Sequence, residues 1–153
     1  MSKIKLPGGA HWNVKRMGDT QRERLRKAAI TFRPILEVIR QLRAGEVDSV
    51  RGRPVARDWL GDWMEIAPAM EGWADCWERI ARHEAMPIDH AAIRKVAKCL
   101  ANGVPLMPEQ VEACARAVQA CYDAYLVLPK SVLVAHIKTE QIAIEMSAMR
   151  EAA

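Results

Sequence analysis

One stretch, residues 54–85, limits the possible folds of this chain more than any other. Its large apolar residues follow one another at steps of four and three, which is typical of an amphipathic helix in heptad phase. They are Trp59, Trp63, Ile66, Met70, Trp73, Trp77 and Ile80. We therefore expect one long helix, kinked at Pro68 on its outer face. The alternative is a break near Ala67, but no Ser, Thr, Asp or Asn stands just before Ala67 to cap a second helix.

A second amphipathic helix is expected from Asp19 or Thr20, which can cap it, to Ala44-Gly45. Its apolar seam consists of Leu25, Ala28, Phe32, Ile35, Ile39 and Leu42. Pro34 interrupts the pattern, and Thr31 could cap a new helix with Pro34 in its first turn. The other faces of this helix are rich in arginine.

Start and stop signals predict further helices in the second half of the chain. Asp89 can cap a short helix that ends at Asn102-Gly103, and Pro108 suits the first position of the next helix, which ends before Pro129. Residues 131–149 contain two strand-like apolar triplets. They lack the Gly or Asn of a tight hairpin between them, so a helix is favoured there over a hairpin.

These elements predict an all-α fold. We expect a compact bundle of five or six helices in a single domain, residues 19–153, with internal prolines in two of the helices. Residues 1–18 are expected to form a basic N-terminal arm, because Pro7-Gly8-Gly9 breaks any regular element. A chain of 153 residues that is 50% apolar is long enough to bury a core without disulfides or metals.

The charge is divided unevenly along the chain. Residues 1–53 carry a net charge of +8 and residues 54–153 a net charge of −4. Part of the basic charge is expected to face the acidic exterior of the tryptophan helix, with the two apolar seams packed together. The rest is available to an anionic partner. The candidate partner-binding residues are Lys15, Arg16, Arg22, Arg26, Arg33, Arg51 and Arg53. The candidate core or partner seam is Trp59, Trp63, Trp73 and Trp77.

Four residues, Arg51-Gly52-Arg53-Pro54, match a short DNA-binding pattern. They resemble the core of an AT-hook, a peptide that lies in the minor groove of A·T-rich DNA. The resemblance implies that Arg51 and Arg53 occupy the groove and that Gly52 lets the backbone approach closely. The preceding Asp48-Ser49-Val50 departs from the basic flanks of that family. The favoured alternative is a loop in which the glycine turns the chain and the proline starts a helix.

Signatures of enzymes and metal sites are missing from the sequence. There is no Gly-rich phosphate loop and no G-x-S-x-G. The histidines and the four cysteines, Cys76, Cys99, Cys114 and Cys121, show neither C-x-x-C nor H-x-x-x-H spacing. We therefore expect no catalytic residue, no metal and no cofactor. The cysteines are expected to be reduced core thiols of a cytoplasmic protein, since neither a signal peptide nor a membrane span is evident.

Two functions fit this sequence. The first is a small non-enzymatic interaction protein that docks on a protein or nucleoprotein complex through basic and helical surfaces. By analogy of type alone, phage and plasmid proteins of this kind serve as accessory inhibitors or regulators. The alternative is a DNA- or RNA-binding regulator that uses residues 1–53. A heptad seam can also serve a homodimer.

Overall fold

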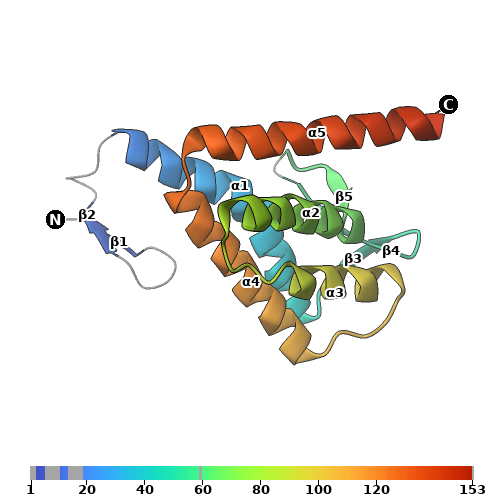
Figure 1. Cartoon of the computed structure of the whole chain (residues 1–153). Coiled ribbons are helices and arrows are strands. Elements are labelled where there is room, and N and C mark those ends of the chain that lie inside the picture. The colour runs from blue at the N-terminus through green and yellow to red at the C-terminus, as the bar shows by residue number, and fades with distance from the viewer. Residues whose placement is uncertain (1–2, 6–10, 14–18, 59, 153) are drawn as a thin grey trace.

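The computed structural model describes residues 3–5, 11–13, 19–58 and 60–152 and is mostly helical. Its helices are α1 (Asp19–Ala44), α2 (Ile66–Glu84), α3 (His90–Ala101), α4 (Pro108–Val127) and α5 (Lys130–Ala152) (Figure 1). Strands β1 (Lys3–Lys5) and β2 (His11–Asn13) pair with each other within the predicted arm. Strands β3 (Asp48–Val50), β4 (Arg53–Arg57) and β5 (Trp63–Glu65) form an antiparallel sheet in chain order. The prediction of a purely α-helical fold missed this sheet.

Helix α1 carries the predicted seam. Ala28, Phe32, Ile35 and Ile39 are buried, as the heptad spacing predicts. Pro34 lies inside the helix, which continues past it to Ala44. A proline here leaves the carbonyl of Ile30 without its usual donor. The Ile30 side chain is exposed, so this carbonyl is on the side of the helix that water reaches.

The single long helix predicted for residues 54–85 is wrong. Helix α2 begins at Ile66, and residues 53–65 form β4, a turn and β5 instead. The Asp58 carboxylate accepts hydrogen bonds from the backbone N–H groups of Leu60 and Asp62, and Gly61 adopts a φ of 85°. An Asp-based turn closed by a left-handed glycine satisfies the backbone locally and competes with a helix. The helical spacing from Trp63 to Ile66 therefore joins two different elements, β5 and α2.

Pro68 is the third residue of α2, in its first turn, where the N–H that proline lacks would have no partner within the helix. The predicted kink is therefore absent, because the proline stands at the start of a helix. Glu65 precedes that helix and makes no side-chain capping bond. Strand β5 leads straight into the first turn of α2, so the missing cap residue was no sign of a continuous helix.

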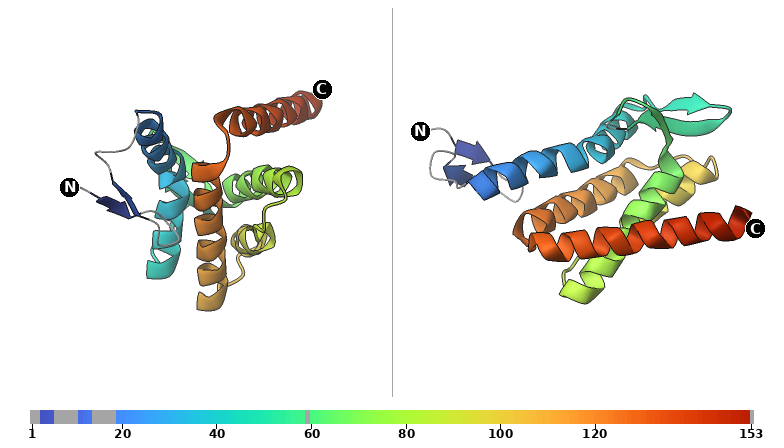
Figure 2. Two further views of the ribbon diagram at one scale, coloured as in Figure 1. Left: turned by 60° about the vertical axis from the view of Figure 1, so that its left-hand side comes forward. Right: turned by 90° about the horizontal axis from the view of Figure 1, so that it is seen from above.

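The other predicted helices are present. Asp89 caps α3 through a 3.2 Å hydrogen bond from the backbone N–H of Ala92, and Pro108 is the first residue of α4. Residues 131–149 lie within α5, so the hairpin alternative is wrong. Helix α5 crosses over α2, and its C-terminal half extends beyond the rest of the helices (Figure 2).

An aromatic cluster joins three helices at the centre of the core. The fully buried ring of Phe32 on α1 lies 4.9 Å from Trp73 on α2, with the rings edge to face. Its centroid is 5.0 Å from that of Tyr122 and 5.7 Å from that of Tyr125, both on α4. Trp77, the next tryptophan of α2, lies 6.3 Å away. Edge-to-face rings at these separations attract one another beyond the burial of their area.

Two groups of ion pairs on the described residues of α1 and α2 lead to other helices, and not from one of these helices to the other as predicted. Arg94 of α3 instead bridges three carboxylates on the exterior of α2, with N–O distances of 3.0, 2.7 and 2.6 Å to Glu71, Asp75 and Glu78. Arg43, near the end of α1, makes a two-pronged ion pair with Glu112 of α4, at 2.8 and 2.9 Å. The apolar prediction holds at Phe32, while Arg43 of α1 has its ionic partner on α4 and the three α2 carboxylates share one on α3.

Candidate interaction surface

The outward face of α1 carries a stripe of arginines. Arg22, Arg26, Arg33 and Arg40 are exposed and follow one another at steps of four, seven and seven. At 3.6 residues per turn these positions lie on one side of the helix, opposite the buried seam. Eighteen residues at 1.5 Å each give the stripe a length of about 27 Å. We call these four residues the arginine stripe.

Apolar side chains interrupt and flank the arginine stripe. Ile30 and Leu36 are each 44% exposed, which is high for large aliphatic side chains, and Ala29 is exposed between Arg26 and Arg33. A solvated charged face needs no such residues. The outward face of α1 therefore combines arginine with two exposed aliphatic side chains.

The structure uses part of the basic charge internally. Arg40 pairs with Glu37 one turn away at 2.6 Å, and Lys27 pairs with Glu23 at 3.2 Å. Within the described residues, Arg26 and Arg33 make no ion pair. Two charges of the stripe are therefore left for a partner.

The AT-hook-like residues form the turn of a β-hairpin. Arg51 and Gly52 both have positive φ, 54° and 77°, and connect Val50 to its partner Arg53 across β3 and β4. This two-residue connection has the positive-φ signature of a type I′ turn. Arg53 donates a hydrogen bond from its Nη1 to Glu65 Oε1 on β5 at 2.9 Å, while Arg51 makes no ion pair with any described residue.

The tryptophans of the predicted seam do not act together. Trp73 and Trp77 belong to the core, with centroids 6.4 Å apart. Trp63 lies on β5, is 48% exposed, and stacks beneath the Arg57 guanidinium, whose carbon lies 3.7 Å from the ring centre. Trp59 lies outside the described residues, as do Lys15 and Arg16 of the predicted binding set.

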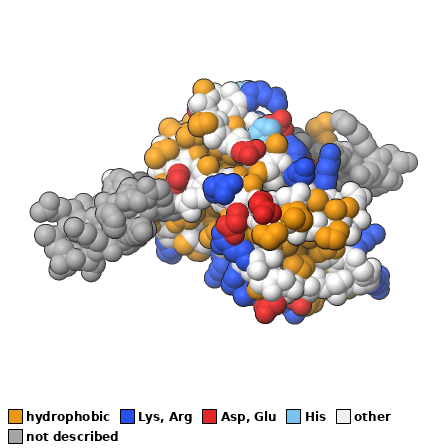
Figure 3. Space-filling model, turned by 90° about the horizontal axis from the view of Figure 1, so that it is seen from below, with side chains coloured by type: hydrophobic (Ala, Val, Ile, Leu, Met, Phe, Trp, Pro, Cys, Tyr) orange, Lys and Arg blue, Asp and Glu red, His pale blue; other side chains and the backbone are white. Residues whose placement is uncertain are grey.

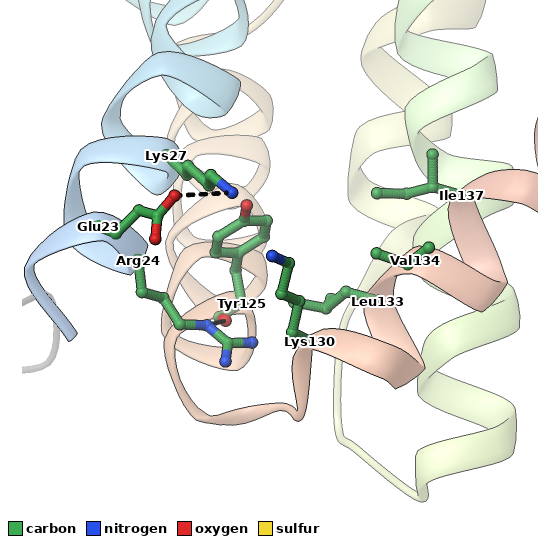
Figure 4. Close-up of a pocket in the computed structure, with 8 residues that line it drawn as sticks. All are labelled: Glu23, Arg24, Lys27, Tyr125, Lys130, Leu133, Val134 and Ile137. Atoms are coloured by element: carbon green, nitrogen blue, oxygen red, sulfur yellow. Dashed lines mark hydrogen bonds and ion pairs between the residues drawn. The ribbon is translucent and has the colours of Figure 1, made fainter. Parts of the chain in front are cut away.

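A pocket opens beside the arginine stripe, where the N-terminal half of α1 meets the end of α4 and the start of α5 (Figure 4). Its volume is about 180 Å³. The lining residues are Glu23, Arg24, Lys27, Tyr125, Lys130, Leu133, Val134 and Ile137. Arg24 holds the walls together, since its Nε donates to the Tyr125 carbonyl at 3.2 Å and its Nη2 donates to the Leu128 carbonyl.

The pocket could not have been read from the sequence. Arg24 and Lys27 share a face of α1 with many other charges, and nothing local marks them. Tyr125 and Lys130 follow about 100 positions later, on either side of the break at Pro129. Only the packing of α1 against α4 brings the two groups together.

Two of the four cysteines, Cys114 and Cys121, are buried in the core, whereas Cys76 and Cys99 are partly exposed. Burial raises the pKa of the Cys114 and Cys121 thiols to about 12, so both are neutral at physiological pH. No group of three potential metal ligands occurs among the residues that the structure describes.

Apolar side chains are exposed among charged ones on the face seen from below (Figure 3).

Comparison with known proteins found no match: no family model, no curated protein and no solved structure matches this chain. Among the described residues, no helix is both long enough and apolar enough to cross a membrane.

Proposed function

We propose that this chain is a non-enzymatic interaction protein that docks on an acidic surface of another protein through the outward face of α1. The observation that carries the proposal is the exposure of Ile30 and Leu36 beside Arg26 and Arg33, which have no ion pair among the described residues. Arginine can bind carboxylates through two parallel hydrogen bonds, and aliphatic neighbours exclude water from such pairs.

The apolar part of this face favours a protein over a nucleic acid as the partner. A phosphate backbone offers charge but little apolar surface, so binding to nucleic acid would leave Ile30 and Leu36 in water. A protein partner can cover both the arginines and the aliphatic side chains. The role we propose is that of an accessory inhibitor or regulator. The arginine stripe of α1 would cover a strip about 27 Å long on the surface of its partner.

Charge reversal tests this proposal against a matched control. The double variant R26E/R33E changes the net charge by −4 on the α1 face, and K95E/K98E makes the same change on two exposed lysines of α3. We expect a partner captured from extract of the native cell, then purified and titrated, to bind R26E/R33E at least about tenfold more weakly than the native protein. K95E/K98E should bind as the native protein does. Equal binding by both variants would refute the role of α1.

A nucleic-acid regulator remains the second candidate, and one observation favours it. Arg51 stands exposed at the tip of the β3–β4 hairpin without an ion pair to any described residue. Titration of generic duplex DNA from 50 to 200 mM salt separates the candidates, because counterion release makes such binding fall steeply with salt, by about 10³ or more for six phosphate contacts. Absence of binding at the lowest salt would exclude free DNA as the partner.

A further inference from the structure

We propose that the pocket between α1, α4 and α5 binds a small aliphatic monocarboxylate, with a chain of about six to eight carbons. The inference is independent of the partner proposed above, since none of the arginine-stripe residues lines the pocket.

The floor of the pocket is apolar. Leu133, Val134 and Ile137 lie on one side of the first two turns of α5 and face the ring of Tyr125 (Figure 4). Leu133 is buried, whereas Val134 and Ile137 are 38% and 41% exposed. Water against these side chains is unfavourable, and an alkyl chain that displaces it gains free energy with each buried methylene.

The size of the pocket limits the chain length. An apolar cavity of about 150 Å³ is large enough for a benzene molecule. At about 180 Å³, this pocket has room for an alkyl group of similar or slightly larger size. A long fatty acid would extend out of it, so the better fit is a short or medium chain.

The rim selects the sign of the ligand charge. The ammonium groups of Lys27 and Lys130 extend toward the Tyr125 ring (Figure 4). Lys27 is already paired with Glu23, whereas Lys130 makes no ion pair with a described residue. Arg24 is occupied by the two α4 carbonyls. Lys130 is therefore the cation of the lining without a hydrogen-bonded or ion-paired partner among the described residues, and it is the group that a ligand carboxylate would pair with.

Glu23 is the acidic group of the rim. Its pKa is lowered first by the hydrogen bond and charge of Lys27 and further by Lys130 and Arg26, so it is ionised at neutral pH. An alkylammonium would meet the unmatched charge of Lys130.

Isothermal titration of the full chain with sodium octanoate tests the proposal. We expect saturable 1:1 binding in the millimolar range or tighter, with hexanoate weaker by about tenfold because it lacks two methylenes. Octylammonium, which keeps the chain and reverses the charge, should not saturate. Octanoate that binds no better than octylammonium would overturn the proposal, as would the absence of saturation at about 10 mM octanoate.

Two variants of α5 locate the site. K130Q removes the unmatched charge, and K138Q removes a neighbouring exposed lysine that does not line the pocket. We expect K130Q to weaken octanoate binding about fivefold and K138Q to leave it unchanged. Equal affinity in both variants refutes the site. R26E/R33E should retain octanoate binding whether or not it loses its protein partner, so failure of one proposal is distinguishable from failure of the other.

Discussion

Replacement of Phe32 by alanine tests whether the aromatic cluster holds the helices together. The ring is fully buried and meets four other aromatic rings on α2 and α4 at centroid distances of 4.9 to 6.3 Å. Phe-to-Ala changes in cores cost about 3–5 kcal/mol, and four ring contacts place this site in the upper half of that range, at about 4 kcal/mol. A domain of ordinary stability, about 5–15 kcal/mol, still folds after such a loss, though only marginally at the lower end.

Urea unfolding followed by tryptophan fluorescence measures the effect, because Trp73 lies against Phe32. Ile30→Ala on the same helix is the matched control, since its exposed side chain should change the free energy of unfolding by no more than about 0.5 kcal/mol. Phe32→Leu, which keeps apolar volume but removes the ring, should cost about 1.5 kcal/mol and remains folded if the alanine variant does not. A cost below about 1 kcal/mol for Phe32→Ala would refute the central role of this ring.

Three further changes test other parts of the structure. Arg94→Met should lower the thermal midpoint by about 2–4 °C at pH 7. Because Arg94 holds the pKa of Glu78 below its ordinary value of 4.5, this difference should shrink as the pH falls below 4.5, which calorimetry can follow. Arg51→Asn, which creates the Asn-Gly pair favoured in type I′ turns, should raise the free energy of unfolding in urea by about 0.5–1 kcal/mol. Ellman's reagent should leave Cys114 and Cys121 unmodified in the native protein and modify all four cysteines in urea.

Each of these expectations has a result that contradicts it. An Arg94→Met difference that grows on acidification would mean that Glu78 is not stabilised by that guanidinium. Loss of stability in Arg51→Asn would contradict the positive φ at this position. If Arg51→Asn is stable yet loses A·T-rich DNA that the native protein binds, the AT-hook function gains support instead. Rapid modification of all four thiols in the native protein would contradict the burial of α4.

The helices whose signals are local could be predicted from the sequence. Asp89 and Pro108 mark where α3 and α4 begin, and the seam around Phe32 identifies the buried side of α1. The arginines of α1 could be placed on a common face for the same reason, because helical periodicity alone decides it.

The sheet and the pocket could not be predicted, for two different reasons. Trp63 and Ile66 have helical spacing, yet Trp63 lies on β5, which follows the Asp58 turn, and strands of three to five residues leave little periodicity to detect. The pocket depends on contacts between residues about 100 positions apart, such as Arg24 and Tyr125, which no local pattern encodes.

The position of Phe32 also has a consequence for synthesis of the chain on the ribosome. Its partners on α2 follow about 40 residues later, and those on α4 about 90 residues later. At about 5–20 residues per second, translation needs roughly 5–20 s to deliver Tyr122 after Phe32. During this time the apolar seam of α1 has no complete surface to pack against. We therefore expect the apolar seam of α1 to stay exposed on the nascent chain until α4 leaves the exit tunnel and closes the core.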